Sequence, residues 1–281
     1  MSISKYLSHI PSFNNKKVLV TGATAGIGLE LTKQLLEKGA FVVMLIRNLD
    51  KGNKVKEELL EINHSYQIDM IQYDQSDYDS IDRAVKEIKE KHSDFYAFVA
   101  NAGILYPSKD ELSKQGNPLT IETNYLGLKR ALSTIVPLYK NKRYVIEGSL
   151  TAKFHVSKKV DIYNNKYTLF KQYNTSKSCV EALFYHFYTT NKDNEFLLVE
   201  PGVTSSDIIR GFHEPIRTLG KWFVRFASHP VNKASLSALK ALCSDSKSGD
   251  FIIPRGLLSY TGFPKKRSFP KHRRREFLIN L

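Results

Sequence analysis

Cysteine is scarce in this chain, which has two cysteines among 281 residues. Cys179 and Cys243 lie far apart in the sequence and form no ligand pair, which argues against a disulfide scaffold and against a zinc site. We therefore expect no bound metal. Long hydrophobic runs are also lacking, because the apolar stretch Phe41–Ile46 is far shorter than the roughly 20 residues of a transmembrane helix. This argues against a membrane span.

Acidic residues are few compared with basic ones: 28 Asp and Glu stand against 42 Lys and Arg, which gives a formal net charge of +14. The hydrophobic content of 42% and the charged content of 25% are ordinary for a globular protein and exclude extensive disorder. A chain of this length fits one large domain or two small ones. The first residues contain no apolar stretch typical of a secretory signal, so we expect a cytoplasmic protein.

Positive charge is concentrated near the C-terminus. The basic residues there, with no acidic residue among them, are Lys265, Lys266, Arg267, Lys271, Arg273, Arg274 and Arg275. We interpret residues 256–281 as a solvated basic tail, and we expect no nucleic acid partner because no nucleic-acid-binding motif accompanies it. A peripheral contact of this tail with an anionic membrane surface stays open, as does a homo-oligomer.

Short β-rich runs alternate with helical patterns over most of the chain. The expected strands are Lys17–Thr21, Phe41–Ile46, Gln67–Tyr73, Phe95–Ala100, Arg143–Gly148, Glu195–Glu200 and Asp250–Pro254. Apolar residues three or four apart predict helices between them, as at Val55, Leu59 and Ile62. This alternation predicts a single α/β domain over residues 16–255, with a Rossmann-type, doubly wound parallel sheet of about seven strands. Residues 1–15 form an N-terminal extension in this interpretation.

Two stretches interrupt this rhythm after strand ends, where open α/β sheets bind ligands. Residues 152–172 are polar and aromatic, and residues 207–229 mix charges with aromatic side chains. We expect both stretches to form walls of a substrate site. The alternative for the second stretch is an amphipathic helix that packs on the core.

A glycine-rich segment, TGATAGIG, lies between the first expected strand and the first expected helix. Its glycines allow a tight turn and let backbone N–H groups approach a pyrophosphate at a helix N-terminus. A glycine triplet alone is a weak signal, and a purely structural turn is the alternative, but this position favours dinucleotide binding. The cofactor contacts expected here are Thr21, Gly22, Thr24, Ala25, Gly26, Ile27 and Gly28.

The end of the second expected strand favours NADP(H) over NAD(H). NAD-binding folds place an acidic residue there for the ribose 2′-hydroxyl, whereas a nearby arginine accommodates a 2′-phosphate. Here Arg47 and Asn48 follow the strand, and no acidic residue occupies its end. We expect Asp50 to cap the next helix and Lys51 to add positive charge. The alternative for Arg47 is a surface charge without a partner.

Tyr173 and Lys177 stand at i and i+4 in the sequence YNTSK, so both lie on one face of a helix. An ammonium group stabilises phenolate, so we expect Lys177 to pull the pKa of Tyr173 below its usual value of about 10. Such a pair is common by chance. Val180 and Phe184 continue the same stripe, which gives this helix a buried side whatever its function.

Other polar or small residues also stand at expected strand ends and helix starts. Ser149 follows the fifth strand and can hold a carbonyl oxygen opposite Tyr173, while Asn124 lies early in a helix and can anchor a water linked to Lys177. The small residues expected to face a cofactor are Asn101, Ala102 and Gly103 after the fourth strand, and Pro201, Gly202, Val203 and Ser206 after the sixth. Each one alone is better explained as a turn or cap. Together they indicate one site.

This set of residues resembles the short-chain dehydrogenase/reductase family over about Lys16 to Pro254. The family's T-G-x-x-x-G-x-G corresponds to Thr21–Gly28, its N-A-G to Asn101–Gly103, and its P-G to Pro201 and Gly202. The resemblance implies that Asn124, Ser149, Tyr173 and Lys177 form a catalytic tetrad. It also implies that Asp74, with Gln75 beside it, contacts the adenine end of the cofactor.

Within the family, the chain is most similar to the retinol dehydrogenase and WW-domain oxidoreductase group, on the basis of Arg47-Asn48, the sequence TNYLG and a long segment between Ser149 and Tyr173. It departs from the family at Gln75, where an apolar residue is common, and at Glu200, where this group commonly has histidine. The resemblance implies an NADP(H)-dependent oxidoreductase that interconverts a carbonyl compound, an aldehyde or ketone, and its alcohol. The aromatic residues of the two irregular stretches favour an apolar substrate. The alternative is a non-catalytic NADP(H)-binding regulator whose basic tail engages a partner.

Overall fold

A computed structural model describes residues 1–105, 111–154, 161–164, 166–204, 230–256, 259–275 and 278. Its strands are β1 (Lys17–Thr21), β2 (Phe41–Ile46), β3 (Gln67–Gln72), β4 (Ala97–Ala100), β5 (Arg143–Glu147), β6 (Glu195–Val199), β7 (Asp250–Pro254) and β8 (Pro264–Ser268). They form one sheet in the order β3-β2-β1-β4-β5-β6-β7-β8, in which only β8 runs antiparallel to its neighbour among the described strands. The predicted doubly wound fold is confirmed, with one strand more than expected.

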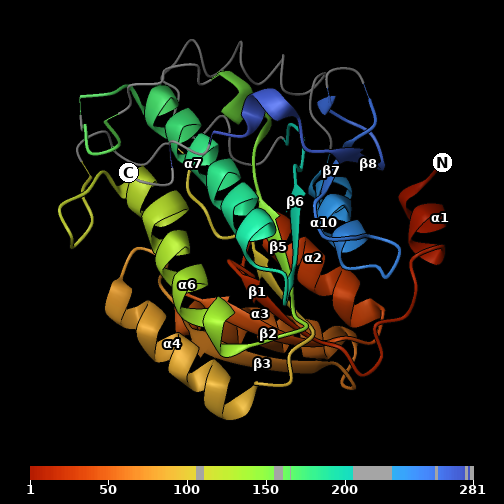
Figure 1. The fold of residues 1–281 in the computed structure, drawn as a ribbon. Coiled ribbons are helices and arrows are strands. Elements are labelled where there is room, and N and C mark those ends of the chain that lie inside the picture. The colour runs from red at the N-terminus through yellow and green to blue at the C-terminus, as the bar shows by residue number, and fades with distance from the viewer. Residues whose placement is uncertain are drawn as a thin grey trace, which may run out of the picture.

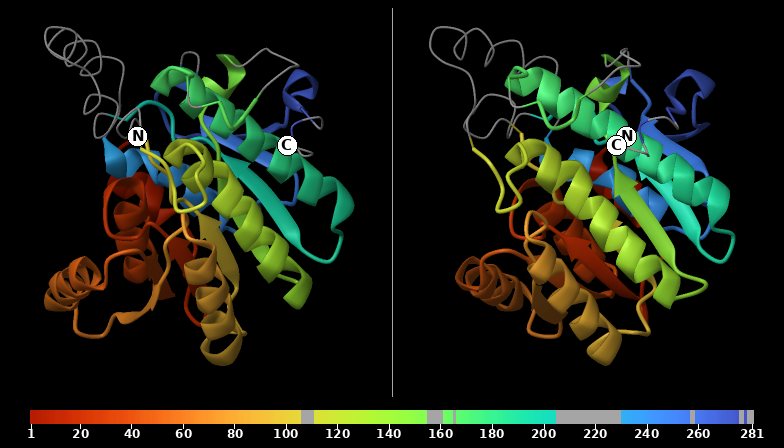
Figure 2. Two further views of the ribbon diagram at one scale, coloured as in Figure 1. Left: turned by 90° about the vertical axis from the view of Figure 1, so that its left-hand side faces the viewer. Right: turned by 60° about the vertical axis from the view of Figure 1, so that its left-hand side comes forward.

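Helices cover both faces of the sheet (Figures 1 and 2). One face carries α4 (Tyr78–Lys91), α6 (Gly127–Ile135) and α7 (Leu169–Thr190), and the other carries α2 (Gly26–Glu37), α3 (Leu49–Ile62) and α10 (Leu236–Ala241). The shorter described elements are α1 (Ile3–Ser8), α5 (Leu119–Ile121), the π-helix η1 (Glu122–Leu126), the 3-10 turns η2 (Val136–Leu138), η3 (Leu150–Phe154) and η5 (Lys271–Arg273), and α9 (Val231–Ala234).

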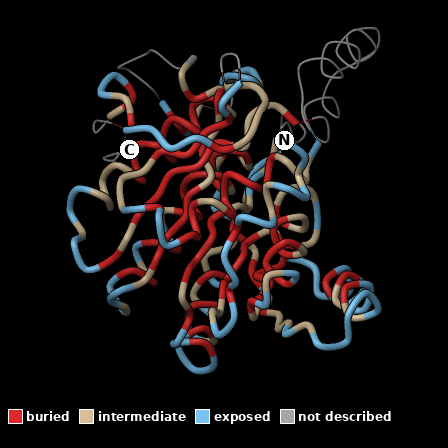
Figure 3. Tube along the Cα trace, turned by 90° about the vertical axis from the view of Figure 1, so that its right-hand side faces the viewer, coloured by how far each residue is buried: buried red, intermediate tan, exposed pale blue. Residues whose placement is uncertain are grey.

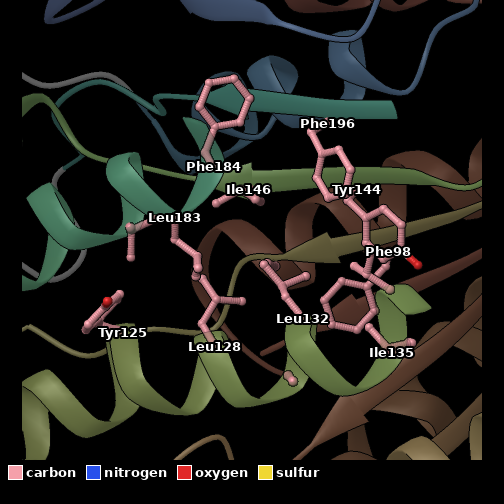
Figure 4. Close-up of a cluster of buried hydrophobic side chains, with 14 of the residues drawn as sticks. Phe98, Tyr125, Leu128, Leu132, Ile135, Tyr144, Ile146, Leu183, Phe184 and Phe196 are labelled. Atoms are coloured by element: carbon pink, nitrogen blue, oxygen red, sulfur yellow. The ribbon is translucent and has the colours of Figure 1, made fainter. Parts of the chain in front are cut away.

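The two helical layers bury two separate hydrophobic clusters against the sheet. Figure 4 shows part of one cluster, in which Leu183 of α7 lies beside Leu128 of α6, and Leu132 of α6 lies nearer to Tyr144 of β5. In Figure 3 the buried residues lie at the centre of the molecule and the exposed ones at its rim. The central strands are apolar throughout, as is typical of a parallel sheet covered on both faces.

In α3, only part of the predicted apolar face is buried. Val55 and Leu59 of α3 are buried, but Ile62 at the end of that helix is 67% exposed. Ile62 is the last residue of the helix, and a short turn from Asn63 to Tyr66 leads into β3. The spacing of three to four residues was therefore right for the first two positions and wrong for the third.

The N-terminal residues predicted to form an extension pack onto the domain. Phe13 is fully buried in the cluster beneath α2, and its backbone N–H donates to the carbonyl oxygen of Lys38 at 2.8 Å. The ring of Tyr6 in α1 stacks on that of Phe263, with 5.1 Å between ring centroids. Ile10 and Phe13 of this segment thus belong to the core of the domain.

The basic segment predicted to be a solvated tail is part of the sheet. β8 pairs with β7 from Asp250 opposite Ser268 to Pro254 opposite Pro264. Its exposed Lys265, Lys266 and Arg267 place charge on an edge strand, which discourages pairing with another chain. In the predicted seven-strand sheet, β7 lies at the edge with unpaired backbone groups. The prediction failed because a charged segment can pair with such an edge through its backbone.

No helix among the described residues is long and apolar enough to cross a membrane.

The order of the strands indicates where a ligand would bind. From β1 the chain adds β2 and β3 on one side, and it then returns to add β4 and the following strands on the other side, so the switch point lies between β1 and β4. Ligands of open α/β sheets bind outside the carboxyl ends of the strands at such a switch point. The residues that follow Thr21 and Ala100 therefore border the expected crevice.

Candidate active site

The glycine-rich turn leaves the N-terminus of α2 without a side-chain cap. α2 begins at Gly26, and neither a side-chain hydrogen bond from Ala25 nor an acidic residue occupies its first turn. Gly22 and Gly26 have φ of 69° and 54°, a region that favours glycine. The uncapped N–H groups and the helix dipole at such an N-terminus favour an anion.

The chain crosses itself closely at this turn. A Cβ atom on Gly28 would lie 2.4 Å from the side-chain nitrogen of Asn101 and 2.4 Å from the carbonyl oxygen of Gly22. A Cβ atom on Gly22 would lie 3.0 Å from that same nitrogen. Both positions therefore require glycine, and the turn is held tightly against the end of β4.

Thr21 and Asn101 join the ends of β1 and β4. The Thr21 hydroxyl oxygen accepts hydrogen bonds from the backbone N–H groups of Asn101 at 3.0 Å and Ala102 at 2.8 Å, and the Asn101 amide donates to the Thr21 carbonyl oxygen at 2.8 Å. Thr21 is fully buried. Its side chain thus fixes the start of the glycine-rich turn to the chain that follows β4.

The residues after β2 divide into an exposed arginine and a helix cap. Arg47 is exposed, and the Asn48 side chain accepts a hydrogen bond from the N–H of Lys51 at 2.8 Å, which makes Asn48 the N-cap of α3. The expectation that Asp50 caps this helix is wrong, because the helix begins at Leu49 with Asn48 as its N-cap, and Asp50 lies in its first turn. Asparagine and aspartate cap helices about equally well, so sequence preference could not separate them.

Asp74 and Gln75, expected near the adenine end, differ in what their side chains do. The Asp74 carboxylate accepts hydrogen bonds from the N–H and hydroxyl of Ser76 at 2.9 and 2.7 Å. Gln75 is 4% exposed, and its amide donates to the carbonyl oxygens of Ala102 at 3.1 Å and Thr123 at 2.6 Å. Both amide hydrogens of Gln75 are used, so its side chain links β4 to the helix that carries Asn124.

Asn124 lies within a π-helix, a rare widening of a helix that is frequent at functional sites. Its side-chain oxygen accepts from the N–H of Ile104 at 2.8 Å, and its amide donates to the Ile104 carbonyl oxygen at 3.0 Å and to the Ser176 hydroxyl at 3.1 Å. Asn124 therefore ties the chain after β4 to α7. One lone pair of the side-chain oxygen remains available to another donor.

The Lys177 ammonium group lies at the end of β5, where it donates to the carbonyl oxygen of Glu147 at 3.0 Å. Burial lowers the pKa of Lys177, and the carboxylates of Glu147 and Glu181 oppose that effect. A Cβ atom on Gly103 would lie 3.2 Å from the Asn124 side-chain oxygen and 3.7 Å from the Lys177 nitrogen. Asn124 and Lys177 thus converge on Gly103 beside the switch point.

Tyr173 and Ser149 belong to the chain segments that meet near the end of β5. Tyr173 lies one turn before Lys177 in α7 and is partly exposed. Ser149 comes two residues after Glu147, and its hydroxyl lies 3.1 Å from that of Thr151. The structure therefore places Ser149 and the Tyr173–Lys177 helix at the carboxyl end of the same strand, next to Asn124.

The loop after β6 begins with Pro201 and Gly202, whose φ is 82°. The N–H of Val203 donates to the carbonyl oxygen of Tyr260 at 2.9 Å, so this backbone donor is already used within the protein. Ser206 lies outside the described residues, as do residues 207–229 and part of the stretch 152–172.

Sequence reasoning missed four charged residues around the site: Glu147, Glu181, Glu200 and Arg273. The acidic residues carried a signal, since each interrupts or ends an otherwise apolar run. Arg273 carried none that separates it from its basic neighbours. The contacts of Arg273 with the two glutamates span 92 and 73 residues of sequence.

The raised pKa of the Glu147 carboxyl can be tested through the pH dependence of stability. Burial raises the pKa of its carboxyl from 4.5 to about 7, and Lys177 opposes the rise. A carboxyl whose pKa is higher in the folded state stabilises the fold at low pH, and that contribution is lost as the pH rises through about 7. Glu147→Gln has no such carboxyl and shows no such loss. The free energy of unfolding of the variant minus that of the wild type should therefore increase by about 1–3 kcal/mol between about pH 5 and pH 8.

Urea unfolding of both proteins across this pH range measures the difference. Glu57→Gln, at an exposed position of α3, is the matched control and should show no such gain. A difference between Glu147→Gln and the wild type that stays constant with pH would mean that the carboxyl is ionised throughout.

A family comparison matches residues 16–215 to the short chain dehydrogenase model. Among curated relatives, an uncharacterized oxidoreductase of Schizosaccharomyces pombe is 38% identical over 42% of this chain and 34% of its own length. The WW domain-containing oxidoreductase of Gallus gallus is 29% identical over 70% of this chain and 49% of its own. An SDR family protein 7-like dehydrogenase/reductase of Dictyostelium discoideum is 29% identical over 74% and 64%. Each match spans less than two thirds of the relative.

Solved structures agree in fold. An uncharacterized protein of Mycobacterium paratuberculosis superposes with a TM-score of 0.74 at 19% identity, covering 98% of this chain and 92% of the other. A short chain dehydrogenase of Burkholderia cenocepacia in complex with NADP has a TM-score of 0.64 at 20% identity, covering 83% and 94%. An alcohol dehydrogenase of Thermococcus sibiricus complexed with 5-hydroxy-NADP has a TM-score of 0.63 at 22% identity, covering 81% and 90%.

The family model covers most of the chain, and its match begins just before the strand that leads into the glycine-rich turn. The fold, the turn and the tyrosine–lysine helix agree with that match. This chain belongs to the short-chain dehydrogenase/reductase family of oxidoreductases.

Proposed function

We propose that this protein is an NADP(H)-dependent oxidoreductase that interconverts an aldehyde or ketone and its alcohol by hydride transfer. The observation that carries the proposal is the convergence of Asn124 and Lys177 on Gly103, at the carboxyl ends of β4 and β5. This is the edge of the sheet where the uncapped N-terminus of α2 can hold a phosphate.

The residues around the crevice fit a dinucleotide. Protein atoms occupy the positions that Cβ atoms would take at Gly22 and Gly28. Because these two residues carry no side chain, the backbone of the turn can come close to a bound pyrophosphate. The turn would hold the pyrophosphate, and Asp74 lies at the end of β3 on the adenine side of the switch point. When bound, NADPH supplies the hydride that reduces the carbonyl carbon.

Arg47 supports NADP(H) as the cofactor. It is exposed directly after β2, and the neighbouring Asn48 uses its side-chain oxygen to cap α3. A guanidinium group binds phosphate with charge-assisted hydrogen bonds, whereas the 2′-hydroxyl of NAD(H) needs an acceptor that this strand end lacks. The complexes of the Burkholderia and Thermococcus enzymes with NADP and 5-hydroxy-NADP favour the same cofactor class.

In the reducing direction, Ser149 and Tyr173 hydrogen-bond the carbonyl oxygen, and Tyr173 donates its proton as negative charge develops there. Lys177 stabilises the phenolate that this leaves, because its ammonium lies one helical turn away on the same face. An oxygen atom of Asn124 holds the water that returns a proton through Lys177. In the oxidising direction the same groups act in reverse order.

Exposed aromatic side chains near the N-terminus of α7 favour an apolar substrate. Phe170 stands three residues before Tyr173, so the two lie on one face of the helix, and Phe170 is 50% exposed. Tyr163 nearby in sequence is 53% exposed. Exposed aromatic rings beside a catalytic group favour an apolar carbonyl compound over a charged one.

The direct test is the oxidation of NADPH by purified protein with a panel of apolar aldehydes, ketones and quinones, with NADH in parallel. Turnover with NADPH supports the proposal and begins to define the substrate. Tight NADPH binding without turnover on any compound would instead support a non-catalytic NADP(H)-binding protein.

Arg47→Asp should move the cofactor preference toward NAD(H). The carboxylate repels the 2′-phosphate and offers an acceptor to the 2′-hydroxyl, so we expect the ratio of kcat/KM for NADPH over NADH to fall by about 10- to 100-fold or more. Lys54→Asp makes the same charge change at an exposed position further along α3 and should leave the ratio nearly unchanged. An equal effect of both variants would assign the preference to overall charge.

A further inference from the structure

We propose that Arg273 is a positioning residue for the reaction: it holds the helix that carries Tyr173 and Lys177 in register with the loop after β6. The inference rests on the proposed function and concerns a residue outside the tetrad and the cofactor turn. Arg273 lies in the basic segment near the C-terminus, which the sequence alone suggested to be solvated.

Arg273 is 5% exposed, and its side chain bridges two buried carboxylates. Its Nε donates to Oε2 of Glu181 at 3.0 Å, and its Nη2 donates to the other oxygen of Glu181 and to Oε1 of Glu200, the latter at 2.5 Å. The side chains of Glu181 and Glu200 are 0% and 1% exposed. Carboxylates this deep in a protein are stable only with a partner, and Arg273 serves both.

The two glutamates belong to the two parts of the site that must be aligned. Glu181 lies one turn after Lys177 in α7, on the same face as Lys177 and Tyr173. Glu200 directly precedes Pro201, where the loop after β6 begins. One guanidinium group therefore connects the catalytic helix to that loop.

Neighbouring residues of the same segment extend this contact. Arg275 donates to the carbonyl oxygen of Ala152 at 2.7 Å and to the hydroxyl of Ser178 at 3.0 Å. The carbonyl oxygen of Leu278 accepts from the hydroxyl of Tyr125, the residue after Asn124, at 3.1 Å. In Figure 1 this blue segment lies at the carboxyl ends of the strands beside the green turn η3. It thus touches the elements that carry Asn124, Ser149 and Lys177.

Arginine is required for this bridge. The planar guanidinium offers several donors in a fixed fork, whereas a lysine ammonium is a point charge that cannot hold two carboxylates in one geometry. The Arg273 guanidinium also lies 5.1 Å from the ring centre of Phe251 and 5.9 Å from that of Phe269. Lysine at this position would keep the charge and lose the alignment.

Arg143 provides a matched control, because it is an equally buried arginine far from the site. It is 5% exposed, its Nε donates to Glu195 at 2.7 Å, and its other nitrogens donate to backbone carbonyl oxygens such as that of Cys243 at 2.7 Å. As the first residue of β5, it stands at the amino ends of the strands, opposite the crevice. Arg143→Lys therefore removes a comparable buried fork without touching the catalytic helix.

The experiment compares Arg273→Lys, Arg143→Lys and the wild-type chain, each at a temperature equally far below its own Tm. We measure kcat and KM for NADPH, the emission of bound NADPH, and the affinity for 2′,5′-ADP, which occupies only the adenine half. For Arg273→Lys we expect kcat to fall at least about tenfold and the nicotinamide emission to change. Its KM for NADPH and its 2′,5′-ADP affinity should stay within about twofold of the wild type, because the phosphate turn is untouched. Arg143→Lys should lower Tm and leave kcat unchanged.

If Arg273→Lys does not fold, Glu200→Gln carries the test, because it replaces one charged arm of the bridge by a neutral amide of the same size and leaves the pair of Arg273 with Glu181 in place. The same selective loss of kcat is expected. If Arg273→Lys kept the kcat of the wild type, or if kcat fell equally in Arg273→Lys and Arg143→Lys, Arg273 would have only a structural role and the inference would be overturned. A wild-type protein that neither binds NADPH nor turns over any substrate would overturn the proposed function itself, and the positioning role with it.

Discussion

Replacing Tyr173 with phenylalanine is expected to lower kcat by about 1000-fold or more while NADPH binding stays within about twofold. The change removes one hydroxyl from a partly exposed position of α7 and leaves the ring in place. In the proposed mechanism this hydroxyl is the acid that protonates the carbonyl oxygen, and Lys177 is present to stabilise its conjugate base. A water molecule cannot replace a positioned acid at comparable efficiency, so the loss should appear in kcat.

The measurement is steady-state NADPH oxidation with the best substrate of the panel, together with a fluorescence titration of NADPH. Tyr185→Phe removes the same hydroxyl three turns further along α7, where the side chain packs at the core boundary, and should leave kcat unchanged. Activity of Tyr173→Phe near that of the wild type would remove Tyr173 from the mechanism, whatever the fold suggests.

Replacing Gly28 with alanine is expected to raise the dissociation constant of NADPH by about 100-fold or more. The new methyl group would lie 2.4 Å from the carbonyl oxygen of Gly22, a backbone atom that cannot swing aside as a flexible side chain could. The turn must open to relieve this contact, and the opening also disturbs the hydrogen bond from Asn101 to Thr21. The N–H groups that would hold the pyrophosphate then lose their common direction.

Calorimetric titration with NADPH measures this loss, and circular dichroism confirms that the variant is folded at the temperature used. Glu37→Ala, at an exposed position of the same helix, should bind as the wild type does. Where Gly28→Ala does not fold, Gly22→Ala tests the same turn: Gly22 has a φ of 69°, and a Cβ atom there would meet the Asn101 side chain at 3.0 Å instead of 2.4 Å. Unchanged affinity in a folded variant of either kind would place the pyrophosphate elsewhere.

The amino-acid sequence by itself determined the architecture and the local parts of the site. The central strands are near-continuous apolar runs that only a buried parallel strand accommodates, and the observed β1 and β2 have the predicted bounds. The glycine turn and the tyrosine–lysine pair could be found because each is encoded within a few consecutive residues. Their chemistry depends on helix geometry and turn geometry, which are local properties.

Only the tertiary structure decided which charged residues are buried and what they hold. Arg273 resembles its basic neighbours in sequence, yet among the described basic residues of this segment it is the one that hydrogen-bonds both Glu181 and Glu200, which lie far away in the chain. Gln75 departs from the family pattern because its amide joins Ala102 to Thr123, and no spacing rule predicts that junction. A side chain's environment is set by segments that fold against it from elsewhere in the sequence, so the burial of a charge and the identity of its partner emerge only when the sheet and its helices assemble.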